Sequence, residues 1–97
     1  MATYISLVHF TDQGIRQIKQ TTERATALTA MAAKLGVKIK DTYWTMGDYD
    51  AVLVSDAPDD ETITALALNL GSLGNVRTQT MRAYSADEMK KILAKLP

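Results

Sequence analysis

The chain has 97 residues, close to the usual size of one domain, and 46% of them are hydrophobic while 23% are charged, as in a folded globular protein. Its 11 basic and 11 acidic residues cancel, so it lacks the basic excess of a nucleic-acid-binding protein. The absence of cysteine excludes disulfides and thiol nucleophiles, and no apolar run approaches the roughly 20 residues of a membrane-spanning helix. We therefore expect one cytoplasmic domain over residues 1–97, with no nucleic-acid or membrane partner.

Residues 3–10 predict the first strand, because they are rich in β-branched and aromatic side chains. Large apolar groups lie on both faces of that strand, with Ile5 and Leu7 on one face and Tyr4 and Val8 on the other. A strand with one side in water alternates apolar and polar residues. This strand is therefore expected to be covered on both faces.

The next segment predicts two helices separated by a break. Thr11 or Asp12 is suited to cap the first helix, since either side chain can accept a hydrogen bond from a free amide. Weak helix formers at residues 21–22 predict the break, and apolar residues at helical spacing predict the second helix over residues 23–35. Gly36 follows at once and is suited to end that helix in the left-handed conformation.

Two strands joined by a hairpin are expected next, over residues 37–46 and 49–55. A Gly47-Asp48 pair between strands is typical of a tight turn, and glycine tolerates the positive φ that such a turn requires. The continuous apolar run from Ala51 to Val54 predicts a central strand that is covered on both sides.

A further helix and strand follow the hairpin. The acidic cluster from Asp59 to Glu61 favours a helix start over a metal site, because negative charge stabilises the N-terminal end of a helix. Gly71 is expected to end this helix. Residues 76–84 predict the fourth strand, which is polar enough for a sheet edge or the wall of a cavity.

The C-terminal segment predicts a last helix that begins with a capping box, in which Ser85 is the cap and Glu88 lies three residues on. Four apolar residues of this helix are expected to be buried: Met89, Ile92, Leu93 and Leu96.

This order of elements predicts a ferredoxin-like α+β fold, βαββαβ, with a four-stranded antiparallel sheet and an added C-terminal helix. Both main helices then lie on one face of the sheet. Because the first and third strands are apolar on both faces, we expect a second copy of the chain to cover the open face, in a homodimer or a larger homo-oligomer. The C-terminal helix is the alternative cover.

The segment from Tyr43 to Asp50 resembles the signature of the GYD domain family, in which Gly47, Tyr49 and Asp50 match the Gly-x-Tyr-Asp core. The resemblance extends over nearly the whole chain. It implies a barrel of the dimeric α/β type, a group that includes cofactor-free oxygenases, haem-dependent enzymes, isomerases and ligand-binding regulators. The resemblance implies no particular activity, because the fold alone does not choose among these functions.

His9 and Asp50 are the candidates for proton transfer. His9 is the only histidine, and Asp50 shares the apolar face of the third strand, where a carboxylate needs partners. The structural alternatives are a hydrogen-bonded histidine at a strand end, and a carboxylate that forms an ion pair or caps the turn. One histidine with no cysteine is a poor metal site, so we expect neither a metal nor another cofactor.

Six residues are candidates for contact with a small-molecule ligand: Tyr43, Trp44, Tyr49, Asp50, Arg77 and Arg82. The aromatic residues have packing in the core or at an interface as their alternative role, and the arginines have ion pairing. Arg77 and Arg82 are predicted to lie on opposite faces of the fourth strand, so they cannot easily act together.

The leading hypothesis is an oligomeric small-molecule-binding or auxiliary domain. One alternative is a cofactor-independent, oxygenase- or isomerase-like enzyme that acts on a small aromatic or keto compound through His9 or Asp50. Another is a purely structural assembly domain. A pocket that holds His9 or Asp50 beside Trp44 or Tyr49 would favour a binding or catalytic site, and a solid core would favour the structural role.

Overall fold

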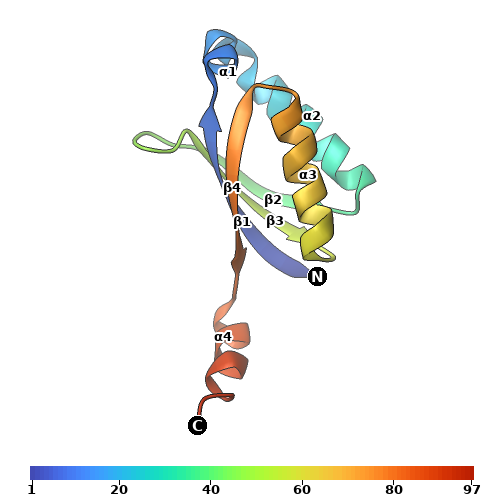
Figure 1. Cartoon of the computed structure of the whole chain (residues 1–97), viewed down its shortest axis with the longest axis vertical. Helices are drawn as coiled ribbons and strands as arrows, with labels where there is room; N and C mark the ends of the chain where they lie inside the picture. Colours follow the sequence, from blue (N-terminus) through green and yellow to red (C-terminus); the bar gives the residue numbers. More distant parts are fainter.

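A computed structural model describes residues 1–97. Figure 1 shows one twisted sheet with two long helices on the same side, while the C-terminal segment extends away from them. In chain order the elements are β1 (Ala2–Phe10), α1 (Asp12–Arg16), the 3-10 turn η1 (Ile18–Gln20), α2 (Thr21–Lys34), β2 (Lys38–Trp44), β3 (Ala51–Ala57), α3 (Asp60–Ser72), β4 (Val76–Ala83) and α4 (Ala86–Leu93). No helix is both long enough and apolar enough to span a bilayer.

The sheet has the strand order β2-β3-β1-β4, and every neighbouring pair is antiparallel. This is the ferredoxin-like arrangement that the sequence predicts. The two central strands, β1 and β3, are those whose side chains are apolar on both faces. The central position of β3 is confirmed, while cover on both faces of these strands stays a prediction, because the helices of the chain cover only one face.

The hydrophobic core lies between the sheet and the helices. It contains ten buried residues, among them Tyr4 and Val8 of β1, Leu53 of β3, Leu28 of α2 and Leu66 of α3. Both helices thus pack on one face of the sheet, as predicted.

The other face of the sheet carries no helix of this chain, and we call it the open face. Directly paired residues of an antiparallel sheet point to the same side. Ile5 of β1 pairs with Val54 and Met81, and Leu7 pairs with Val52. These five apolar residues therefore form the centre of the open face, where Met81 keeps 40% of its surface exposed.

The hairpin between β2 and β3 is longer than predicted. The Thr45 amide donates to the Asp50 carbonyl oxygen at 2.9 Å, so residues 46–49 form the connection and the expected two-residue turn is wrong. Gly47 does adopt positive φ, +106°. The physical reason for the longer loop is that β1 binds Asp50: the Asp50 amide donates to the Val8 carbonyl oxygen at 2.8 Å.

Other differences are small shifts at helix ends. The predicted break lies one turn earlier, because η1 precedes α2 and α2 begins at Thr21. Gly36 has the expected positive φ, +78°. α3 runs past Gly71 to Ser72, and Gly74 instead adopts positive φ, +85°.

The last helix differs most from its prediction. Its capping box forms as expected, with Ser85 accepting from the Glu88 amide. However, none of its residues is buried, and Leu93 and Leu96 are 51% and 65% exposed. The expected burial of Met89, Ile92, Leu93 and Leu96 is therefore wrong for the single chain. Only two residues separate β4 from α4, so the helix continues beyond the end of the sheet and does not cover the open face (Figure 1).

Substitutions of two glycines, Gly14 and Gly71, test how the loops at one end of the sheet pack. A Cβ atom on Gly14 would lie 2.0 Å from the Asn75 carbonyl oxygen, whereas one on Gly71 would meet nothing within 4 Å. We expect Gly14→Ala to lower the free energy of unfolding by about 1–3 kcal/mol through overpacking. Gly71 lies inside α3, so Gly71→Ala is expected to raise the free energy of unfolding by about 0.5–1 kcal/mol. Urea unfolding measures both, and equal effects would contradict the described packing.

Candidate functional site

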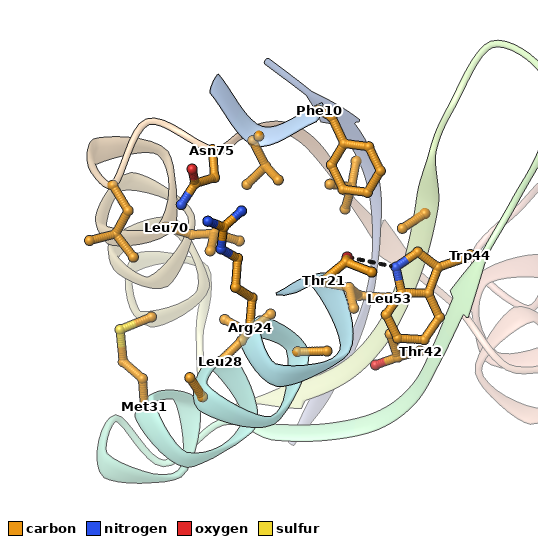
Figure 2. Close-up of a pocket in the computed structure, with 17 residues that line it drawn as sticks. Phe10, Thr21, Arg24, Leu28, Met31, Thr42, Trp44, Leu53, Leu70 and Asn75 are labelled. Carbon is orange, nitrogen blue, oxygen red and sulfur yellow. Dashed lines mark hydrogen bonds between the residues drawn. The ribbon is translucent and has the colours of Figure 1, made fainter. Parts of the chain in front are cut away.

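The candidate site is a pocket of about 180 Å³ between α2, α3 and one end of the sheet. Of its 17 lining residues, 12 are hydrophobic and none is acidic. Figure 2 shows these side chains arranged as a ring, with Leu70 on one side and Trp44 on the other. An apolar pocket with a few polar groups is typical of small-molecule sites.

The pocket exists because small residues of α2 line it. Ala25 and Ala27 both line the pocket, where larger side chains would fill it. Leu28 and Met31 of the same helix contribute apolar walls, and Leu53 of β3 lines the pocket from the sheet. Leu28 and Met31 are three residues apart and therefore lie on the same side of α2, while Ala25 and Ala27 flank them on either side.

Arg24 is the only charged residue among the lining residues. Its Nη2 atom donates to the side-chain oxygen of Gln17 and, at 3.5 Å, to that of Gln20. None of the three ion pairs of the chain includes Arg24. Arg24 as a whole is half-buried, and no carboxylate of this chain neutralises the charge of its guanidinium.

Trp44 is the one predicted ligand residue that lines the pocket. Its indole N–H donates to Thr21 Oγ1 at 3.0 Å, which ties β2 to the start of α2. Figure 2 shows this hydrogen bond at the edge of the pocket.

Four other candidates lie on the open face or at its end. Tyr43 pairs with Val52, and Arg77 pairs with His9. The rings of His9 and Tyr49 meet edge to face, with centroids 4.6 Å apart. The structure therefore brings together His9, Tyr49 and Arg77, but on the side of the sheet opposite to the pocket.

Asp50 has a structural role in this geometry. Its Oδ2 atom accepts a hydrogen bond from the Phe10 amide at 2.8 Å, at the end of β1. No hydrogen bond joins Asp50 to His9. The two candidates for proton transfer thus form no acid–base pair, and neither lines the pocket.

Arg82 lies on the helix-covered face, opposite to Arg77 as predicted. It forms an ion pair with Glu88 at 3.0 Å, and its guanidinium carbon lies 4.5 Å from the centre of the Tyr84 ring. The Ser85 amide and Arg82 together hold the pKa of Glu88 below its usual value. Arg82 therefore joins α4 to β4, which is the pairing role weighed as its alternative.

A second, more polar hollow lies beside the start of α3 and is lined by Tyr4, Asp60 and Arg82 among others. The Tyr4 hydroxyl donates to Asp60 Oδ1. This hydrogen bond, together with burial and the nearby negative charge, raises the pKa of Tyr4 to about 12. Tyr4 therefore stays protonated and acts as a donor here.

Sequence reasoning missed the residues of α2, above all Arg24, Leu28 and Met31. The available signal was a charged residue next to small alanines on the inner side of an amphipathic helix. That signal is weak, because a pocket depends on how far α2 stands from α3, and this distance is set by tertiary packing.

The Tyr4–Asp60 hydrogen bond predicts a pH effect on stability. Because the pKa of Tyr4 is about 12 in the folded chain and 10.0 in an isolated side chain, only the unfolded chain loses this proton between those values. The free energy of unfolding should therefore fall as pH rises from about 10 to about 12. Asp60→Asn should lower the Tyr4 pKa and weaken this fall, as measured by phenolate absorbance and urea unfolding.

The control for that experiment is Asp87→Asn, which changes an exposed carboxylate of α4 whose ion-pair distance to Lys90 is 4.0 Å. It should leave the titration of Tyr4 unchanged. If Asp60→Asn also leaves it unchanged, the assigned cause of the raised pKa is wrong.

The chain is similar in sequence to one known protein and in fold to several solved structures. It is 33% identical over 90 residues to the "Glutamine synthetase and cystathionine beta-lyase binding protein" of Thermus thermophilus, in an alignment that covers 92% of this chain and 95% of that protein. The crystal structure of the Thermus thermophilus protein TTHA0845 is similar with a TM-score of 0.57 and 26% identity, covering 89% of this chain and 96% of that one.

An ACT domain protein from Streptococcus pneumoniae is similar with a TM-score of 0.50 and 22% identity, covering 86% of this chain and 90% of that one, which supports the fold. The model of the GYD domain matches residues 4–93. The Gly-x-Tyr-Asp segment, the fold and this match agree, and the chain belongs to the GYD domain family.

Proposed function

We propose that this protein is a homo-oligomeric auxiliary domain that binds a small molecule and acts by association, not by catalysis. The observation that carries the proposal is the open face of the sheet, whose centre is formed by five apolar residues from three strands. Contiguous exposed apolar patches on soluble proteins commonly mark interaction sites. A second copy of the same face would cover it in the manner of a dimeric α/β barrel.

The surroundings of this patch suit an interface. Polar groups lie around the apolar centre, including His9, Arg77 and the ion pair of Lys40 with Asp56 at 3.9 Å. An apolar centre with a polar rim is the usual anatomy of a protein–protein interface. The formal net charge of zero gives little repulsion between copies.

α4 offers a second unpartnered apolar surface. Its Met89 and Leu93 side chains are 44% and 51% exposed, although the helix is capped and joined to β4 through the Arg82–Glu88 ion pair. A helix that is held in place but buries nothing in its own chain is suited to pack on another copy. We propose that the oligomer buries both the open face and α4.

The pocket supports the small-molecule part of the proposal. Catalysis has less support, because His9 and Asp50 are engaged elsewhere and do not line it. The Thermus thermophilus relative is named as a binding protein of two enzymes. That name supports an auxiliary role for this chain in which it associates with other proteins.

Self-association is tested by a charge on the open face. We expect the wild-type protein to have a mass of at least twice the 10.6 kDa monomer at micromolar concentration, and Leu7→Lys to be a folded monomer. Lysine at this position would place a charge in the centre of the interface, while remaining solvated in a single chain. Light scattering after size-exclusion chromatography measures the mass, and circular dichroism checks the fold.

The matched control is Leu68→Lys, the same substitution at a 70% exposed position of α3 away from the open face. It should leave the oligomer intact. A monomeric wild-type protein at micromolar concentration would contradict the proposal.

The role of α4 is tested by replacing Met89 and Leu93 with serine together. Both side chains are about half exposed in the single chain, so its folding should change little. Self-association should weaken by about tenfold or more, because each buried apolar side chain contributes about 1.5–3 kcal/mol. Analytical ultracentrifugation over a dilution series measures the dissociation constant of the oligomer. Replacing Lys90 and Lys91 with serine is the control on the same helix, and equal effects of the two double variants would refute this role.

A further inference from the structure

The pocket between α2, α3 and the sheet has the size of a small ligand. An apolar cavity of about 150 Å³ binds benzene. The volume here is about 180 Å³, so a six-membered ring or a branched aliphatic group of similar size fits with a small substituent. With 12 hydrophobic residues among the 17 that line it, the body of that ligand must be apolar.

The charge in the pocket restricts the ligand further. Arg24 is the only cation among the lining residues, and no acidic residue lines the pocket. Both hydrogen bonds of its guanidinium go to neutral amide oxygens and use Nη2, so Nε and Nη1 have no acceptor within the chain. A guanidinium has five N–H donors and binds carboxylates through two parallel hydrogen bonds.

Asn75 adds a second donor near this cation. Its Oδ1 atom accepts from Gln13 Nε2 at 2.9 Å, which leaves the amide NH₂ without a partner in the chain. Figure 2 shows that NH₂ directed toward the Arg24 guanidinium, and both residues line the same pocket. The indole N–H of Trp44 is already bound to Thr21. The free polar groups at this end are therefore donors, and they fit a ligand group that only accepts.

We propose that this pocket binds a small monocarboxylate with an aromatic or branched aliphatic body, whose carboxylate pairs with Arg24 and accepts from Asn75. This inference rests on the small-molecule binding proposed above and names its ligand class. A single guanidinium matches a single negative charge. A polyphosphate would need several cations or a loop of free backbone amides, and the lining residues offer neither.

Phenylacetate is the probe, and phenylacetamide is its neutral counterpart of nearly the same shape. Trp44 is the only tryptophan, so its fluorescence reports binding in this pocket, and isothermal titration calorimetry gives an independent affinity. We expect phenylacetate to bind about tenfold or more tightly than phenylacetamide, because the hydrogen bonds to Arg24 are then charge-assisted on both sides. Arg24→Gln should remove most of this difference.

Two further variants control the experiment. Arg16→Gln makes the same change at an exposed position of α1 that does not line the pocket, and it should leave both affinities unchanged. Ala25→Leu fills the pocket from the residue next to Arg24 without changing a charge, and it should weaken both probes. Thermal unfolding checks that each variant is folded, and Ala25→Leu keeps the location testable if Arg24→Gln does not fold.

The outcomes separate the two proposals. Equal affinities of the two probes for the wild-type protein would overturn the carboxylate assignment and leave small-molecule binding in place. Binding of neither probe at millimolar concentration would overturn the assignment together with the proposed binding function of the pocket. Unchanged phenylacetate binding by Ala25→Leu would show that the ligand binds elsewhere, and it would also refute the assignment.

Discussion

The register of β1 against its two neighbours is the constraint on which the rest of this structure depends. β1 pairs with β3 on one side and with β4 on the other. Its side chains point alternately to the two faces of the sheet, and the residues paired with them on β3 and β4 point to the same faces. Tyr4, Ser6 and Val8 thereby face the helices, and Ile5 and Leu7 face away. A slip of one residue would exchange the two sets. The Asp50 carboxylate, bound to the Phe10 amide, fixes this register at the end of β1.

The contacts of the Gly-x-Tyr-Asp segment help to fix the register of β1. Gly47 supplies positive φ in the hairpin, Tyr49 places its ring against His9 and donates to Gln79 at 3.2 Å, and Asp50 binds β1. The segment is thus a structural connection between the hairpin and the central strand. It also places an aromatic ring at the end of the open face, which makes the hairpin part of the proposed interface.

Features that depend on local sequence were predictable. The continuous apolar run of β3 indicated a central strand, and short polar residues indicated the helix starts, as Ser85 shows for α4. The hairpin length was not predictable, because the backbone of Asp50 pairs with β1, which is distant in the sequence. The pocket was not predictable either. Trp44 was identified, but Arg24 was not, because the pocket that it lines forms only through tertiary packing.

The proposed oligomer would link association to folding in this protein. Only 13 of the 97 residues are buried in the single chain, and ten of these form its core. Small domains have little stability to spare. The apolar residues of the open face and of α4 are only partly buried in the single chain, and the proposed oligomer would bury them further. This further burial would make the free energy of unfolding increase with the logarithm of the protein concentration. Substitutions on the open face, which leave the core of one chain intact, would act on stability mainly by weakening the proposed assembly.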